Sequence, residues 1–153
     1  MLTWQIGAVR VTQIVELTTA SLGPFVLPQA TPELMQKEPW LRPFVDADGK
    51  IVLSIHSLVV ESQGQRLLVD TCIGNDKQRN YPRWNGMQTD FLAKLSHAGY
   101  APDAIDTVMC THMHVDHVGW NTRLVDDRWV PTFTNARYLF AELEWEYWRN
   151  EEQ

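Results

Sequence analysis

Thr111-His-Met-His-Val-Asp-His117 is the stretch that decides the fold of this 153-residue chain. It contains three of the five histidines and one aspartate, at His112, His114, Asp116 and His117. Imidazole nitrogen and carboxylate oxygen are ligands that a borderline-soft divalent ion such as Zn²⁺ favours. Without a metal ion, each of these groups would need another polar partner when buried. The cluster therefore predicts a metal site.

The spacing of the cluster predicts that it lies on a turn. On a strand, His112, His114 and Asp116 would share one face and His117 would point away. On a helix, His114 and His117 would be neighbours, but the four side chains would not gather on one face. The preceding residues Thr107–Cys110 are β-branched or apolar, which is typical of a short buried strand. We therefore expect a strand that delivers the cluster into a loop, where rigid scaffolds often carry functional residues.

With its flanking residues, this segment resembles the signature of the metallo-β-lactamase-fold hydrolase superfamily. Upstream, Arg66-Leu-Leu-Val-Asp-Thr-Cys-Ile-Gly74 resembles the family's strand that ends in Asp-Thr-Gly, with Cys72 where the glycine is usual. Downstream, Gly119-Trp120-Asn121 is more similar to the lactonase-like and organophosphate-hydrolase-like branches than to antibiotic-degrading enzymes. The resemblance implies an α+β fold, a four-layer αββα sandwich, of which this chain supplies the N-terminal sheet and its covering helices.

The resemblance also implies roles for single residues. His112 and His114 would bind one metal ion, and Asp116 and His117 a second ion nearby. Water that bridges two such ions is acidified toward hydroxide, and the ions polarise a carbonyl or phosphoryl oxygen. Asp116 is further expected to be catalytic by handling the proton. Asp70 is expected either to hold the motif loop, as carboxylates near ligating histidines do, or to cap the end of its strand.

The function that the resemblance implies is hydrolysis of an ester, lactone or related bond in a small molecule, with two Zn²⁺ ions per complete site. Two alternatives stay open at this point. The first is a fragment that does no chemistry. The second is a mononuclear-iron oxygenase on the same fold, because the same cluster also suits iron.

Counting ligands predicts that residues 1–153 form one domain truncated at its C-terminus. A catalytic zinc ion normally keeps three protein ligands and an open position, whereas the motif gives two ligands to each of two ions. No histidine follows His117 in the sequence. Asp126 and Asp127 come too soon to match the family's bridging carboxylate and are expected to form a polar turn. The missing ligands would then come from a homo-oligomer or from pairing with a C-terminal half.

Composition argues against two classes of partner. The net charge is −6 and no lysine or arginine cluster is present, which disfavours nucleic acid. No apolar run approaches the roughly 18 residues of a membrane helix.

The N-terminus lacks the basic and apolar regions of a signal peptide, and Cys72 and Cys110 are the only cysteines. These features predict a cytoplasmic protein without disulfides.

Local patterns predict the remaining regular elements. Strands are expected at Gly7–Glu16, Ile51–Val60 and Arg66–Asp70, the last two joined around Gln63-Gly64, and helices at Asp90–Ala98 and Ala141–Arg149. Thr89 is the expected N-cap of the first helix, and Gly99 the residue that ends it. Residues 20–44 contain too many prolines for regular structure. The last helix carries an apolar stripe that needs a partner surface.

Overall fold

The computed structural model describes residues 1–151, except for the side chain of Pro24. The chain divides into two compact units, Met1–Glu16 together with the chain from His56 onward, and Leu17–Ile55. Its strands are β1 (Thr3–Ile6), β2 (Val9–Thr19), β3 (Leu53–Ser62), β4 (Gln65–Val69), β5 (Thr107–Met109), β6 (Thr122–Val125), β7 (Arg128–Pro131) and β8 (Arg137–Leu139). Its helices are α1 (Gly23–Val26), α2 (Pro32–Lys37), α3 (Phe91–His97) and α4 (Glu142–Asn150), with 3-10 helices η1 (Pro39–Phe44), η2 (Pro102–Ala104) and η3 (Gly119–Asn121).

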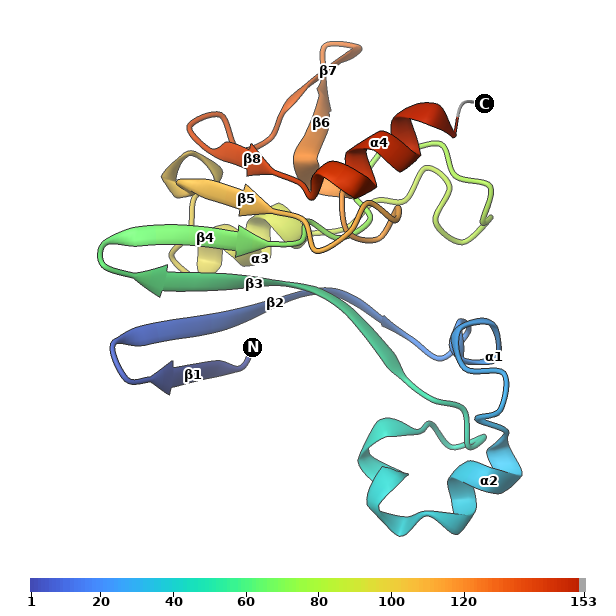
Figure 1. Cartoon of the computed structure of the whole chain (residues 1–153). Coiled ribbons are helices and arrows are strands. Elements are labelled where there is room, and N and C mark those ends of the chain that lie inside the picture. Colours follow the sequence, from blue (N-terminus) through green and yellow to red (C-terminus); the bar gives the residue numbers. More distant parts are fainter. Residues whose placement is uncertain (152–153) are drawn as a thin grey trace. The chain divides into compact units, whose positions relative to one another are not determined.

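A six-stranded mixed sheet, in the order β1-β2-β3-β4-β5-β8, is the centre of the first unit (Figure 1). The pairs β1/β2 and β3/β4 are antiparallel, and β4/β5 and β5/β8 are parallel. Gln63 and Gly64 both have positive φ, as a tight two-residue hairpin turn between β3 and β4 requires. The predicted hairpin is therefore confirmed, as is the predicted combination of sheet and helices.

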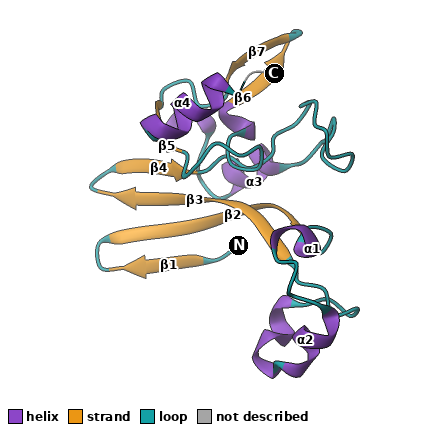
Figure 2. Ribbon diagram, turned by 45° about the vertical axis from the view of Figure 1, so that its right-hand side comes forward, coloured by secondary structure: helices purple, strands orange, loops and turns teal. Residues whose placement is uncertain are grey.

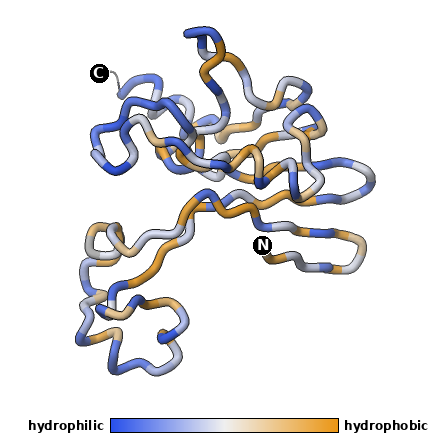
Figure 3. Tube along the Cα trace, turned by 180° about the vertical axis from the view of Figure 1, so that it is seen from behind, coloured by the Kyte–Doolittle hydropathy of each residue, from blue (hydrophilic) through white to orange (hydrophobic). Residues whose placement is uncertain are grey.

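The parallel strands determine where the site can form. Leu68 of β4 and Val108 of β5 are opposite each other and fully buried. Strands that run parallel need a crossover connection, and here the chain crosses through α3 (Figure 2). Phe91 and Leu95 of α3 are also fully buried. Because β4 and β5 end at the same edge of the sheet, the loops that follow them meet there. The hydropathy colours in Figure 3 show apolar residues concentrated along the central strands.

Strand β2 has its more buried face on the even-numbered residues. Thr12, Ile14 and Glu16 are buried, while the valines at 9, 11 and 15 are only partly buried. The predicted strand over Gly7–Glu16 is confirmed in place. The edge strand β1 was not predicted, because its alternation of Thr3, Trp4, Gln5 and Ile6 is only four residues long. All four residues are exposed, so burial in the core does not mark this strand either.

The start of α3 corrects one expectation. Thr89 is not the N-cap residue; that position is Asp90, whose side chain makes no capping hydrogen bond. The Thr89 hydroxyl instead donates to Glu16 (3.0 Å) and its backbone N–H donates to Asn75 (2.7 Å). Gly99 does end the helix as predicted, with φ of +92°.

The second unit corrects another expectation, because residues 20–44 include α1, α2 and η1. Proline disrupts a helix interior but is accepted in the first turn, where its missing N–H would have no partner. Pro32 and Pro39 occupy such starting positions in α2 and η1. Thr31 caps α2 by accepting a hydrogen bond from the backbone N–H of Leu34 (3.3 Å). Pro32 and Pro39 therefore begin short helices here, although Pro43 lies inside η1.

The C-terminal elements follow the prediction in place. Asp126 and Asp127 form the turn between β6 and β7, both with positive φ, so the predicted polar turn is confirmed. Helix α4 matches the predicted helix, but its apolar stripe is open: Leu143 is 81% exposed and Tyr147 55%. Within residues 1–151, every helix is too short or too polar to span a bilayer.

Candidate metal centre

The histidine motif lies in the loop between β5 and η3, as the spacing predicts. A turn forms where the backbone N–H of His117 donates to the carbonyl of His114 (2.9 Å). The backbone N–H of Thr71 donates to the carbonyl of His117 (2.8 Å) and joins this turn to the loop after β4. The loops that follow two neighbouring parallel strands therefore hold each other.

The fold brings the imidazole rings of the motif together. The ring centroids of His112 and His117 are 3.9 Å apart, and those of His112 and His114 are 4.7 Å apart. An Asp116 carboxylate oxygen lies 3.6 Å from Nε2 of His117. We call His112, His114, Asp116 and His117 the motif cluster.

The motif cluster has the donor types that suit zinc, but its donor atoms do not converge on one point. In residues 1–151, no group of three or more histidine, cysteine, aspartate or glutamate side chains is arranged so that it could hold a metal ion. Zinc ligation needs nitrogen and oxygen donors at about 2 Å from a common centre. The residues fit a zinc ion in kind and in proximity, and their side chains would have to reorient to ligate one.

Asp70 fastens the motif loop at both of its ends. Its carboxylate accepts hydrogen bonds from the backbone N–H of Thr111 (2.7 Å), from the Thr111 hydroxyl (2.9 Å) and from Nδ1 of His117 (2.9 Å). Because an ionised carboxylate only accepts, Nδ1 of His117 carries the hydrogen. The lone pair of Nε2 is then left for another partner, which is the arrangement found in ligating histidines.

Opposite pKa shifts accompany this pair. Burial would raise the pKa of Asp70, but the hydrogen bonds from His117 and Thr111 outweigh it and hold this pKa below its usual range. The hydrogen bond to Asp70 raises the pKa of His117, partly opposed by burial. The pKa of His112 is lowered, first by burial and then by the neighbouring His117 and His114. The pKa values of His117 and His112 are thus shifted in opposite directions.

In the metal-free protein, we expect the contribution of the Asp70–His117 pair to stability to decrease as the pH rises above about 6.5. A histidine whose folded pKa is raised stabilises fully below its unfolded pKa, and this stabilisation is lost as the pH passes the folded pKa. The pair is partly exposed, so about 1 kcal/mol or less is expected. Urea unfolding of wild type and Asp70→Asn between pH 5.5 and 8.5 measures the difference. Parallel pH profiles would contradict the pairing.

Glu16 is a residue of the site that sequence reasoning missed. Its side chain is 4% exposed and accepts hydrogen bonds from the backbone N–H of Ile73 (2.7 Å) and from Nε1 of Trp120 (2.7 Å). The N–H of Gly74 and the hydroxyl of Thr89 donate to it as well, at 3.3 and 3.0 Å. Glu16 therefore joins the loop after β4 to η3, which directly follows the motif. The sequence carries no signal for this role, because only the fold shows that Glu16 lies on the buried, even-numbered face of β2.

Gly119 lets η3 lie against the loop after β4. Gly119 donates its N–H to the carbonyl of Cys72 (2.7 Å), and a Cβ on Gly119 would lie 1.8 Å from the carbonyl oxygen of Ile73. Cys72, at the position where the family has glycine, adopts φ of +53° and is fully buried. Burial raises the pKa of its thiol, so it remains protonated and packs as a small core residue beside Ser57 (3.3 Å).

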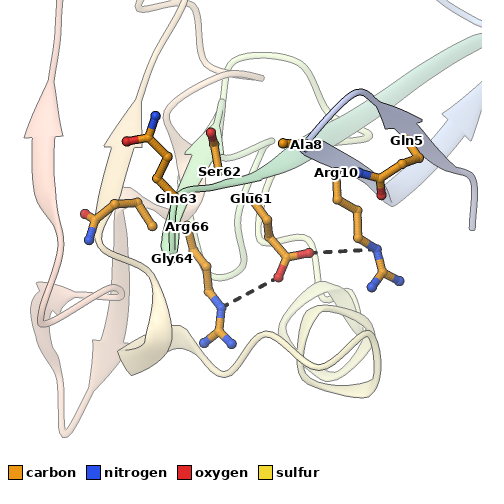
Figure 4. A pocket seen from close by; sticks show the side chains of 9 residues that line it. Gln5, Ala8, Arg10, Glu61, Ser62, Gln63, Gly64 and Arg66 are labelled. Carbon is orange, nitrogen blue, oxygen red and sulfur yellow. Dashed lines mark ion pairs between the residues drawn. The ribbon is translucent and has the colours of Figure 1, made fainter.

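A separate hollow of about 350 Å³ lies around the turns between β1 and β2 and between β3 and β4 (Figure 4). Glu61 lies between Arg10 and Arg66, with nitrogen–oxygen distances of 3.8 and 4.0 Å. Exposed ion pairs of this length contribute little to stability. Its lining contains no histidine or cysteine, so the motif loop is the better candidate for chemistry.

Solved structures share this fold, and the chain spans about half the length of each one named here. A probable metal-dependent hydrolase from Staphylococcus aureus is 22% identical with a TM-score of 0.74, over 97% of this chain and 52% of that one. The hydrolase AbOPH in the beta lactamase superfamily is 25% identical with a TM-score of 0.68, over 95% and 46%. AidC, a dizinc quorum-quenching lactonase in complex with the product N-hexnoyl-L-homoserine, is 21% identical with a TM-score of 0.70, over 99% and 48%.

Sequence comparison gives the family directly. Among curated proteins, no match was found. The sequence model described as "Metallo-beta-lactamase superfamily" matches residues 51–153, which include β3 to α4 and the whole motif loop. This stretch is more than half of the chain, so the family predicted from the motif is confirmed. The chain belongs to the metallo-beta-lactamase superfamily.

Proposed function

We propose that this chain carries the metal-binding part of a metal-dependent hydrolase that acts on an ester, lactone or related bond of a small molecule. The observation that carries the proposal is the gathering of His112, His114 and His117 on one loop, with ring centroids 3.9 and 4.7 Å apart. The family membership and a dizinc lactonase of similar fold support it. We propose Zn²⁺ as the cofactor, with two ions per complete site.

The proposed division of ligands follows the motif: His112 and His114 for one ion, and Asp116 and His117 for the other. When bound, zinc supplies an acidified water and a Lewis acid for the substrate oxygen. Asp70 keeps the hydrogen of His117 on Nδ1, so that Nε2 is free to ligate. Asp116 lies beside that nitrogen at 3.6 Å and is partly exposed, and we propose that its carboxylate takes up the proton of the attacking water. Groups outside the motif are proposed to fill the remaining ligand positions.

Replacing His114 with alanine should weaken zinc binding by about 100-fold or more, because a ligand is lost and even partners that only orient a ligand give 10- to 100-fold losses. Competition with a chromophoric chelator measures the affinity. His97→Ala is the matched control, since His97 is exposed on α3 and its ring nitrogen lies 3.3 Å from the carbonyl of Ala93 in the same helix, away from the motif loop. Equal affinities for the His114 variant and wild type would contradict the site.

Hydrolysis is tested separately on the zinc-loaded chain with aryl esters and lactones. Any turnover should disappear after chelation, return with added zinc, and be absent from His114→Ala. Turnover that survives in His114→Ala would contradict a reaction at this loop.

A further inference from the structure

Helix α4 contacts the motif loop through a side chain that the proposed chemistry does not use. A carboxylate oxygen of Glu144 accepts a hydrogen bond from the backbone N–H of Met113 (2.9 Å). Met113 lies between His112 and His114 in the motif. The same oxygen accepts a hydrogen bond from Nε1 of Trp148 (3.2 Å), one helical turn further along α4.

Trp148 also contacts the motif cluster directly. Its ring lies edge-on to the imidazole of His114, with centroids 5.7 Å apart and planes at 80°. This is the favoured edge-to-face arrangement of two aromatic rings. Glu144 and Trp148 therefore contact neighbouring parts of the motif, one its backbone and the other a ring.

We infer that Glu144 and Trp148 are positioning residues for the motif cluster. A hydrogen bond to the N–H of Met113 fixes the peptide plane between His112 and Met113, and so limits the directions in which both flanking imidazoles point. Trp148 limits the rotation of the His114 ring and holds the Glu144 carboxylate in place. Functional groups need such support to keep a productive geometry. This inference rests on the proposed function only where it concerns metal binding.

The exposure of α4 supports this role. Leu143 is 81% exposed and Tyr147 55%, so burial of these side chains contributes little to holding the helix in place. Trp148 is more covered, at 37%, and lies on the side that meets the motif loop. The contacts of Glu144 and Trp148 with the loop are therefore a main attachment of this helix among the described residues.

The test uses Glu144→Ala, Glu144→Gln and the control Glu146→Ala in the full chain. Glu146 is exposed on the same helix, and among the described residues no hydrogen bond joins it to the motif loop. In the metal-free protein, Glu144→Ala should shift the Met113 amide resonance, speed its hydrogen exchange by about tenfold and move the His114 ring protons. Zinc affinity should fall by about tenfold. Glu144→Gln keeps an acceptor oxygen and should restore most of both properties, and Glu146→Ala should resemble wild type.

The two readouts separate failure of this inference from failure of the proposed function. If wild type does not bind zinc, the metal proposal is wrong, and the Met113 and His114 signals still decide the positioning role. If wild type binds zinc and Glu144→Ala matches it in affinity and in the Met113 amide, the positioning role is wrong. A Glu144→Gln variant as impaired as Glu144→Ala would also overturn it, because the acceptor oxygen would then not be what matters.

Discussion

Gly119→Ala is expected to destabilise the first unit by about 4 kcal/mol or more, enough to prevent folding under ordinary conditions. A Cβ at this position would lie 1.8 Å from the carbonyl oxygen and 1.9 Å from the carbonyl carbon of Ile73, and 2.6 Å from the backbone nitrogen of Gly74. All of these are backbone atoms, so no side-chain rotation can relieve the overlap. Close-packed interiors resist such insertions.

Gly23→Ala is the matched control for this prediction. A Cβ on Gly23 would meet the carbonyl oxygen of Ile51 at 3.6 Å, an ordinary van der Waals contact within the second unit. We expect a change of less than about 1 kcal/mol, because helix propensity favours alanine over glycine. Urea unfolding followed by tryptophan fluorescence measures both variants. A Gly119→Ala midpoint within error of wild type would show that η3 is not packed against the loop after β4.

The elements that could be predicted from the sequence are those with local signals. The motif could lie only on a turn, because its four ligand-type side chains match neither the helical nor the strand period. The hairpin around Gln63-Gly64 and the end of α3 at Gly99 follow from residues that accept positive φ. The strand before the motif follows from its β-branched and apolar residues. Each of these depends on a few neighbouring positions.

What could not be predicted depends on contacts between distant positions. The sequence places Glu16 in a strand as an ordinary charged residue, and only the fold shows it among donors from the loop after β4, from Thr89 before α3 and from η3. Glu144 looked like a solvated helix residue, and only the fold brings it to Met113. In the same way, the sequence gives the ligand types of the motif cluster but not the angles of its rings.

Glu16→Gln is the second change with a large expected effect, about 3 kcal/mol of stability, because buried donors left without an acceptor cost about 1–3 kcal/mol each. One oxygen of Glu16 accepts from Trp120 (2.7 Å), Thr89 (3.0 Å) and Gly74 (3.3 Å), and the other from Ile73 (2.7 Å). In glutamine, an NH₂ group replaces one of the two acceptor oxygens. Whichever way the amide is turned, this NH₂ faces at least one donor, which then has no acceptor.

Glu61→Gln is the control for Glu16→Gln, since Glu61 is 29% exposed and its ion pairs with Arg10 and Arg66 are long. Glu61→Gln should lower the stability by about 1 kcal/mol or less, even though the Tyr100 hydroxyl (2.6 Å) loses its charged partner.

The effect of Glu16→Gln should also reach the motif, because Thr71, in the loop that Glu16 holds, donates its N–H to the carbonyl of His117 (2.8 Å). Zinc affinity should therefore fall in Glu16→Gln and not in Glu61→Gln. Equal unfolding midpoints for the two variants would mean that the four donors find other acceptors, and would contradict the role of Glu16 in holding the loop after β4.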